Sequence, residues 1–284
     1  RPAASGPYMV LLRALVGLLC AAGLAVASEL FATFDPAAGT WTLGNEQVSA
    51  VFELNPKGQF RFVRLSNLAS GEEWRAPAGA VVAPFWVALE DRIVEGTGPY
   101  RLVSQWISEV DRAGLRQTIV LDHLELPARV RLEVEVYPGQ PVIRYRSWLQ
   151  NRSTRRFWIS EARMLNWQFA DSGRSFRSFR VNQWVGSGKG GNFELIETTI
   201  EPDGRQAEVY SGAHGQHCAW LVTRDSANRG LFFGWEFDGR ARVHLRQSRL
   251  GARLEIAGGP TELFHPVDPE EEFLTPAAFL GVFR

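Results

Sequence analysis

The feature that most constrains the fold of this chain is the alternation of apolar and polar side chains in short segments separated by turn residues. In residues 129–137, four valine or leucine side chains alternate with arginines and glutamates. A period of two residues is typical of a half-buried β-strand. A Pro-Gly pair follows, and the apolar segment 142–149 returns after it. The two segments therefore predict an antiparallel hairpin.

Other segments of the chain show the same strand-like character. Residues 47–54 alternate cleanly, and residues 81–89 are almost entirely apolar, which predicts a strand buried on both faces. In residues 60–65 the apolar side changes midway, which predicts a β-bulge. Apart from the N-terminal leader, no segment shows helical periodicity with capping residues over more than two turns. We therefore predict an all-β fold, a large antiparallel β-sandwich.

Two further strand-like runs are joined by the polar link TRDSANRG, which ends in glycine as a hairpin loop should. Residues 217–223 place Cys218, Trp220 and Val222 on one face, which we expect to be the inner one. Residues 231–237 place leucine, phenylalanine and tryptophan side chains on one face. We therefore predict a second hairpin in this part of the chain.

The N-terminus has the features of a secretory signal peptide. Residues 9–27 combine Arg13, an apolar run and an Ala-Val-Ala cleavage site. We expect residues 1–8 to be upstream translation and residues 28–40 to be an N-terminal segment. The mature protein is predicted to be secreted or periplasmic, with no membrane attachment after cleavage. Cys218 is then its only cysteine, so no internal disulfide is expected.

The charge balance gives no electrostatic reason to expect nucleic acid or an anionic membrane as a partner. Basic and acidic residues number 31 each, which leaves a formal net charge of zero. Ten tryptophans and eighteen phenylalanines are a heavy aromatic load. In a β-rich protein most of them are expected in the core, although exposed rings can stack on sugars. No motif predicts a cofactor.

Several short motifs occur in an order and spacing that are together moderately specific. They combine aromatic residues with glycine and span essentially all of residues 41–284. They are Trp41-Thr42-Leu43-Gly44-Asn45, Gly58-x-Phe60, Leu65-x-Asn67-Leu68, Gly71-Glu72-Glu73-Trp74, Tyr210-Ser211-Gly212, Gly215-Gln216-His217, the segment 230–236 with Gly239, and Glu272-Phe273-Leu274-Thr275-Pro276. This arrangement resembles the N-terminal domain of glycoside hydrolase family 36, the α-galactosidases and their relatives.

The resemblance implies a β-supersandwich of the galactose-mutarotase-like type over residues 41–276. Residues 277–284 would then start a linker to a (β/α)8 barrel. In the family, the two catalytic aspartates of the retaining mechanism belong to that barrel. We therefore expect a non-catalytic domain that packs on its own C-terminal catalytic barrel. It would shape the cleft for an α-galactoside-type carbohydrate and support a homo-oligomer.

Glu236 and Asp238 are the strongest candidate for a pair of catalytic carboxylates. Two residues apart on one strand, they would share a face with Cα atoms about 6.6 Å apart. However, side chains that project in parallel cannot reach an anomeric centre from opposed directions. A solvated or loop-capping pair is the simpler interpretation, and we predict no catalytic residue in this chain.

His214, His217 and Cys218 have the residue types of a metal site. No second cluster of histidine or cysteine lies at ligand spacing from them. A turn whose histidines bond to the backbone is the simpler interpretation, and we predict no metal.

Residues 186–192 are rich in glycine but lack the Gly-Lys-Ser/Thr ending of a phosphate-binding loop. Glycines allow a backbone to approach a ligand or a neighbouring domain closely. In the family this resembles, the sandwich can lend residues to an active site of the assembly. We therefore predict that Trp184, Lys189 and Asn192, with Trp74 behind them, lie near substrate. The alternative is an ordinary exposed loop with a packed tryptophan.

Asn151, Arg152 and Ser153 form an N-glycosylation sequon. The sequon follows the end of a predicted strand, so we expect Asn151 to be exposed. Whether it carries a glycan depends on the host.

Two other functions stay open at the level of sequence. In a self-contained aldose epimerase or mutarotase-like enzyme, His214 and His217 would act as acid and base, with Glu236 or Glu272 as base. In a stand-alone carbohydrate-binding module, exposed tryptophans would stack on sugars.

Overall fold

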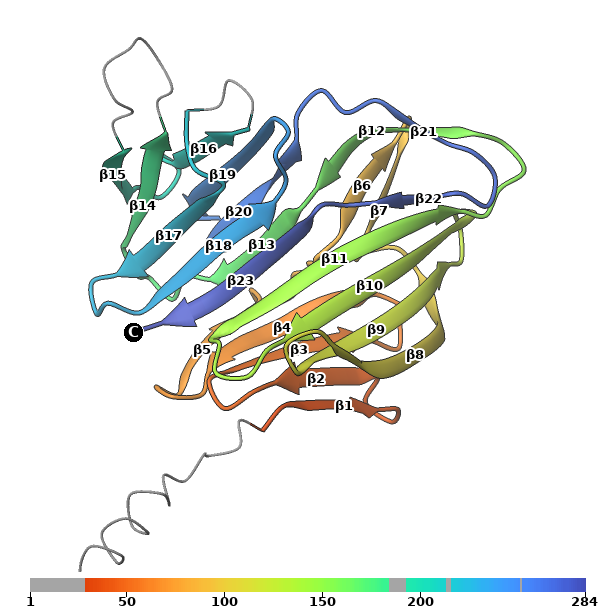
Figure 1. Ribbon diagram of the computed structural model, residues 1–284, viewed down its shortest axis with the longest axis horizontal. Coiled ribbons are helices and arrows are strands. Elements are labelled where there is room, and N and C mark those ends of the chain that lie inside the picture. The colour runs from red at the N-terminus through yellow and green to blue at the C-terminus, as the bar shows by residue number, and fades with distance from the viewer. Residues whose placement is uncertain (1–28, 184–192, 213–215, 251) are drawn as a thin grey trace, which may run out of the picture.

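Figure 1 shows the computed structural model, which describes residues 29–183, 193–212, 216–250 and 252–284. Within these ranges the chain forms 23 strands in antiparallel sheets and no helix. The predicted all-β sandwich is therefore confirmed. No described residue belongs to a helix that could cross a membrane. The predicted signal peptide, residues 9–27, lies outside the described ranges.

The first sheet is a meander of five strands in chain order, red to orange in Figure 1. Its strands are Phe31–Asp35 (β1), Thr40–Gly44 (β2), Val48–Leu54 (β3), Phe60–Asn67 (β4) and Glu72–Arg75 (β5). The predicted bulge is present in β4, where Phe62 pairs with Phe52. Arg64 pairs with the preceding residue of β3, Val51, so Val63 is the extra residue.

The second sheet has ten strands and forms the long wall of the molecule (Figure 1). Its order is β15-β14-β17-β18-β23-β11-β10-β9-β8, and β22 also pairs with β11. The strands are Tyr100–Val110 (β8), Gly114–His123 (β9), Ala128–Val136 (β10), Val142–Asn151 (β11), Phe176–Gln183 (β14), Phe193–Ile200 (β15), Trp220–Asp225 (β17), Gly230–Glu236 (β18), Glu272–Leu274 (β22) and Ala277–Phe283 (β23). Both predicted hairpins are present, as β10 with β11 and β17 with β18.

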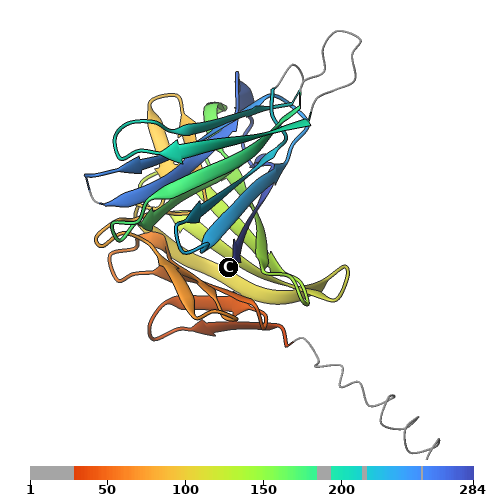
Figure 2. The same cartoon turned by 90° about the vertical axis from the view of Figure 1, so that its left-hand side faces the viewer.

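In Figure 2 the five-stranded sheet lies beneath strands β8 to β11. Two four-stranded sheets complete the sandwich. One has the order β21-β12-β6-β7, with strands Trp86–Leu89 (β6), Arg92–Glu95 (β7), Phe157–Arg163 (β12) and His265–Val267 (β21). The other has the order β13-β20-β19-β16, with strands Leu165–Ala170 (β13), Ala207–Ser211 (β16), Ala241–Ser248 (β19) and Arg253–Pro260 (β20).

Residues 81–89 are largely buried, as predicted, but only the last four form a strand. Val82, Ala83 and Phe85 are at most 5 % exposed. Pro84 has no backbone N–H to donate to a neighbouring strand, which disfavours a ladder here. The first part of this apolar run is therefore a buried loop that leads into β6.

Side chains from three sheets meet in one hydrogen-bonded aromatic cluster. The indole Nε1 of Trp167 in β13 donates to the hydroxyl of Tyr145 in β11 at 2.5 Å. That hydroxyl donates to the carbonyl of Met164 at 2.8 Å. Phe62 of β4 packs edge-on against Trp167, with ring centroids 4.9 Å apart. Burial raises the pKa of Tyr145, so its hydroxyl stays neutral and joins the sheets through the core.

The sandwich extends beyond the predicted boundaries at both ends. In the segment predicted as residues 28–40, Phe34 of β1 stacks on Trp41 with ring centroids 4.7 Å apart. Residues 277–284, predicted as the start of a linker, contain β23, which pairs with β18 on one side and β11 on the other. The apolar alternation of this segment buries Leu280 completely, as in a core strand.

The predicted inner face of residues 217–223 is wrong. Leu221 and Thr223 are fully buried, whereas Trp220 and Val222 lie half-buried on the outer face. Strand β17 runs between β14 and β18, and aromatic side chains of the neighbouring strands share its outer face. Because both faces are apolar here, alternation could not identify the inner one.

The asparagine of the sequon is buried, so its predicted exposure is wrong. Asn151 is 0 % exposed at the end of β11. Its Nδ2 donates to the carbonyls of Arg155 at 2.7 Å and Val267 at 2.9 Å. Its Oδ1 accepts from the backbone amide of Ser153 at 2.9 Å. The side chain thus ties the end of β11 to the loop before β12 and to β21.

We predict that Asn151→Ala lowers the free energy of unfolding by about 3 kcal/mol, because buried backbone groups lose their partners. Urea denaturation followed by tryptophan fluorescence measures the change. Thr154→Ala, at an exposed position of the same loop, is the control and should change stability by less than about 0.5 kcal/mol. Equal stability of the two variants would contradict the role given to Asn151.

Candidate functional site

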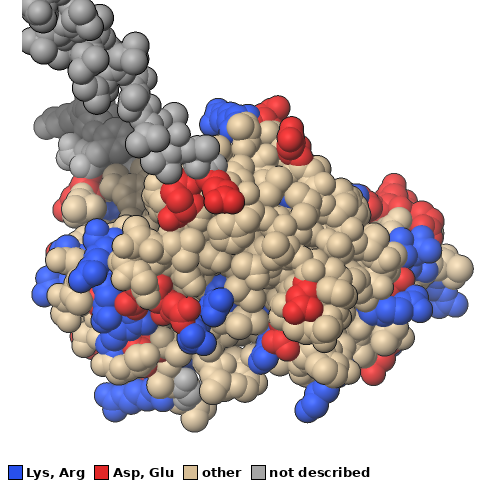
Figure 3. All heavy atoms as spheres, turned by 90° about the horizontal axis from the view of Figure 1, so that it is seen from below, with Lys and Arg blue, Asp and Glu red and all other residues tan. Residues whose placement is uncertain are grey.

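The outer face of the ten-stranded sheet has two halves of different chemistry. We call the part on β8 to β11 the charged half, because its outward side chains are mainly arginine, glutamate and aspartate. We call the part on β17, β18 and β23 the apolar half. On the face seen in Figure 3, positive and negative side chains are interspersed and neither sign forms one continuous patch.

Two glutamates of β10 are buried on the charged half. Glu133 is 8 % exposed and Glu135 is 2 % exposed. Arg116 of β9 and Arg144 of β11 approach Glu135 to 2.7 and 2.8 Å. Arg146 of β11 lies 3.1 Å from Glu133. The strand register sets these pairs, since Arg116 and Arg144 lie directly opposite Glu135 on its two sides.

Glu135 stays ionised at neutral pH despite its burial. Burial alone would raise its pKa, but hydrogen bonds from Tyr137, Arg116 and Arg144 outweigh it and hold the pKa below its usual value. Burial and the 2.7 Å hydrogen bond to Glu135 raise the pKa of Tyr137 to about 12. The phenol therefore remains a donor to a charged carboxylate.

Glu236 extends this network onto β18. Nε and Nη2 of Arg144 donate to the two carboxylate oxygens of Glu236 at 2.6 and 2.7 Å. This bidentate contact lowers the pKa of Glu236. Arg144 thus joins two carboxylates from different strands of the sheet.

The network borders a hollow of about 840 Å³ where the charged and apolar halves meet. This volume is within the usual range of ligand sites. Besides the ion pairs, the hollow has aromatic and polar lining from Glu109, Tyr137, Gln140, Phe232 and Phe279.

Neither Glu135 nor Glu236 has the raised pKa that a general acid for glycoside hydrolysis requires. A general acid must hold a proton at the working pH, which requires a raised carboxyl pKa. Both Glu135 and Glu236 have lowered pKa values. Strand β18 ends at Glu236, so Asp238 lies beyond the strand. The arrangement favours the simpler interpretation of Glu236 and Asp238 over a catalytic pair.

His217 and Cys218 lie just before β17. The backbone amide of Tyr210 donates to Nδ1 of His217 at 3.1 Å. Burial, together with the nearby charge of Arg180, lowers the pKa of His217, so the imidazole is neutral at pH 7. No group of three potential metal ligands occurs in the described ranges. His214 lies outside those ranges.

Three of the four residues predicted near substrate, Trp184, Lys189 and Asn192, lie outside the described ranges. Trp74 is 1 % exposed in β5, and the guanidinium of Arg174 lies 4.2 Å from its ring centroid. In this position Trp74 packs as a core residue. Its proximity to substrate stays a prediction.

The apolar half is built from phenylalanine rings that lie over glycines of the neighbouring strand. The pairs are Phe232 over Gly281, Phe279 over Gly234 and Phe283 over Gly230. A Cβ atom at any of these glycines would fall 2.0–2.1 Å from a ring carbon, so only glycine permits this packing. With Trp220 and Val222, the rings line an apolar hollow of about 430 Å³.

Sequence reasoning found Glu236 but missed the residues that hold it. Arg144 and Arg146 alternate with buried residues of β11, just as Glu133 and Glu135 do on β10. Opposite charges at matching positions of a predicted hairpin are the signal that could have identified the network.

Solved structures with a similar fold include α-galactosidases. The galactosidase domain of an α-galactosidase–sucrose kinase gives a TM-score of 0.70 at 13 % identity, over 89 % of this chain and 42 % of that one. The family 36 α-galactosidase AgaB of Geobacillus stearothermophilus gives 0.71 at 13 % identity, over 89 % and 41 %. The α-galactosidase of Lactobacillus brevis gives 0.69 at 12 % identity, over 88 % and 40 %.

These matches confirm the predicted resemblance at the level of the fold, and the chain spans about 40 % of the length of these proteins. A TPR-domain containing protein from Parabacteroides distasonis also matches, with a TM-score of 0.55 at 11 % identity, over 86 % of this chain and 46 % of that one. The fold alone therefore does not determine the function. No protein-family model and no curated protein sequence matches this chain.

We predict that Glu135→Gln lowers the free energy of unfolding by about 2 kcal/mol at pH 7, because Arg116 and Arg144 lose a buried charged partner. The folded-state pKa of Glu135 lies below its unfolded value. Its contribution is therefore present above about pH 4.3 and is lost as the pH falls through the folded pKa. Urea denaturation at neutral and acidic pH measures this difference, which should shrink in acid.

Glu109→Gln is the matched control, because Glu109 lines the same hollow but is exposed. It should leave stability within about 0.5 kcal/mol of the native value at every pH. A Glu135→Gln effect that stays constant from neutral to acidic pH would argue against a buried ionised carboxylate.

Proposed function

We propose that this chain is the non-catalytic N-terminal sandwich domain of a secreted, retaining α-galactosidase-like glycoside hydrolase. The observation that carries the proposal is the unequal coverage of the structural matches. Family 36 α-galactosidases match nearly all of this chain with about 40 % of their own length. The lowered pKa values of Glu135 and Glu236 also favour a role outside proton transfer.

We further propose that the apolar half packs on the catalytic barrel. Its phenylalanine rings and Trp220 lie next to one another on one face of an open sheet. Contiguous aromatic surface of this kind is typical of interfaces rather than of free surface. The barrel is the occupant we propose, because the matched α-galactosidases are longer than this sandwich.

The proposed ligand of the whole enzyme is an α-galactoside. Structures of α-galactosidase AgaA variants from Geobacillus stearothermophilus contain raffinose or stachyose. In this proposal the sandwich shapes one wall of the cleft through Trp184, Lys189 and Asn192 and supports a homo-oligomer. A secreted or periplasmic location is proposed from residues 9–27 alone.

The proposal predicts that the coding sequence after Arg284 specifies alternating strands and helices with aspartates at strand ends. In that longer polypeptide, Phe279→Ser should lower kcat/KM for p-nitrophenyl α-galactoside about tenfold, because it truncates an aromatic ring at the domain interface. Steady-state kinetics and the melting temperature measure the effect. Phe264→Ser is the matched control, since Phe264 is 70 % exposed and lies outside the ten-stranded sheet.

Two outcomes would overturn the proposal. One is a downstream sequence that encodes no barrel. The other is interconversion of galactose anomers by the isolated chain, with loss of that activity in His217→Ala, as a self-contained epimerase would require.

A further inference from the structure

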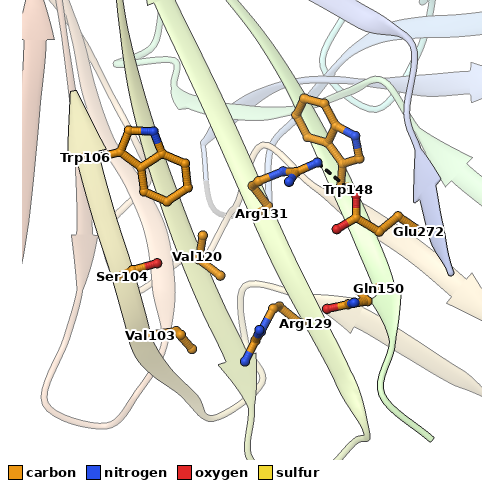
Figure 4. Close-up of a pocket in the computed structure, with 9 residues that line it drawn as sticks. All are labelled: Val103, Ser104, Trp106, Val120, Arg129, Arg131, Trp148, Gln150 and Glu272. Atoms are coloured by element: carbon orange, nitrogen blue, oxygen red, sulfur yellow. Dashed lines mark hydrogen bonds and ion pairs between the residues drawn. The ribbon is translucent and has the colours of Figure 1, made fainter. Parts of the chain in front are cut away.

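A second hollow, of about 310 Å³, lies at the β8 edge of the charged half (Figure 4). Its lining comes from strands β8, β9, β10, β11 and β22, so it draws on segments far apart in the chain. The volume is at the lower end of the range for ligand sites. Because β8 and β17 lie on opposite sides of β11 in the strand order, this hollow is separate from the apolar half.

Trp106 offers an open aromatic surface in this hollow. It is 45 % exposed on the edge strand β8. Within the described part of the chain, no other ring or guanidinium packs against its indole. By contrast, Trp148 is covered by Arg131 and Arg146, whose guanidinium carbons lie 4.2 and 4.6 Å from its ring centroid. In Figure 4, Trp106 and Trp148 flank Arg131 on one face of the sheet.

Fixed polar groups lie beside Trp106. Nη2 of Arg131 donates to the carboxylate of Glu272 at 2.9 Å. Arg129 donates twice to the carboxylate of Asp122, at 2.7 and 3.2 Å. The carboxylate of Asp122 also lies 3.4 Å from Arg101. Arg129 and Arg131 thus each already have a carboxylate partner. Apart from Nε of Arg131, which is buried, their remaining N–H groups and oxygen lone pairs can still bond a ligand.

We propose that this hollow binds one hexopyranose ring of a neutral oligosaccharide. One apolar face of the sugar would stack on Trp106, and neighbouring hydroxyls would bond to Arg131 and Glu272. A few fixed polar groups beside an aromatic surface are what a small polar ligand requires. An anionic ligand fits less well, because Arg129 and Arg131 already have carboxylate partners and Glu272 would repel it.

The identity of the sugar as a galactoside rests on the proposed function, whereas the site itself rests on the geometry of Trp106 and its neighbours. Bound here, the oligosaccharide would be held by the sandwich without undergoing reaction. The hollow is thus an accessory binding site on the β8 edge.

The test is calorimetric titration of raffinose into the full chain. Trp106→Ala should weaken raffinose binding by about tenfold or more, because the loss of stacking on one aromatic ring reduces affinity to about this extent. Trp106→Tyr keeps an aromatic surface and should stay within about threefold of the native affinity. Trp158→Ala should bind as the native protein does, because Trp158 stacks on Phe264 away from this hollow. Galacturonic acid should bind more weakly than galactose.

The inference is wrong if native protein shows no raffinose binding, or if Trp106→Ala binds raffinose as well as native protein. Loss of affinity in both Trp106→Ala and Trp158→Ala would also contradict it, because the effect would not belong to this hollow. The proposed function is tested independently by Phe279→Ser in the apolar half. If Phe279→Ser has its expected effect but native protein does not bind raffinose, only the proposal of an accessory site is wrong.

Discussion

The register between β10 and β11 sets the chemistry of both faces of the ten-stranded sheet. Val134 lies opposite Tyr145 on the inner face, and Glu135 lies opposite Arg144 on the outer face. A slip of one residue would exchange the faces and carry the glutamates of β10 into the core, where an unpaired charge is very costly. The same register brings the Tyr145 hydroxyl to Trp167. The aromatic cluster that joins three sheets therefore depends on this register.

Ion pairs between adjacent strands hold the buried carboxylates of the charged half. Glu135 and Glu133 are buried, and arginines of the adjacent strands compensate both. Such pairs fix side chains in place, and those of Glu135 keep its carboxylate ionised, which suits binding and packing better than proton transfer. At the β8 edge Arg129 and Arg131 are likewise paired with carboxylates beside Trp106. Pairing of arginines with carboxylates thus accounts for the lowered pKa values of Glu135 and Glu236 at the larger hollow and supports the neutral ligand proposed at the smaller one.

Local pattern was sufficient to predict the fold class, several strands, both hairpins and a bulge within residues 60–65, because each depends on neighbours in sequence. It failed where residues far away in the sequence determine which side chains are buried. The inner face of β17 depends on which side of the sheet meets the core, and the burial of Asn151 depends on Val267, 116 residues away. For the candidate site, Glu236 was identified but its partner Arg144 was not. Trp106 was not singled out, because a register irregularity at the preceding residues of β8 interrupts the alternation that would have placed it on a face.

The burial of Asn151 matters for how the protein can be made. In a secretory pathway that glycosylates nascent chains, the sequon is presented while the chain is still extended, before β21 exists to receive the side chain. A glycan on Nδ2 would replace one of the two N–H groups that bond Arg155 and Val267 and could not fit at a fully enclosed position. A chain that is glycosylated at Asn151 therefore cannot complete β11 as described. In a bacterial host without the glycosylation machinery, every chain can complete it.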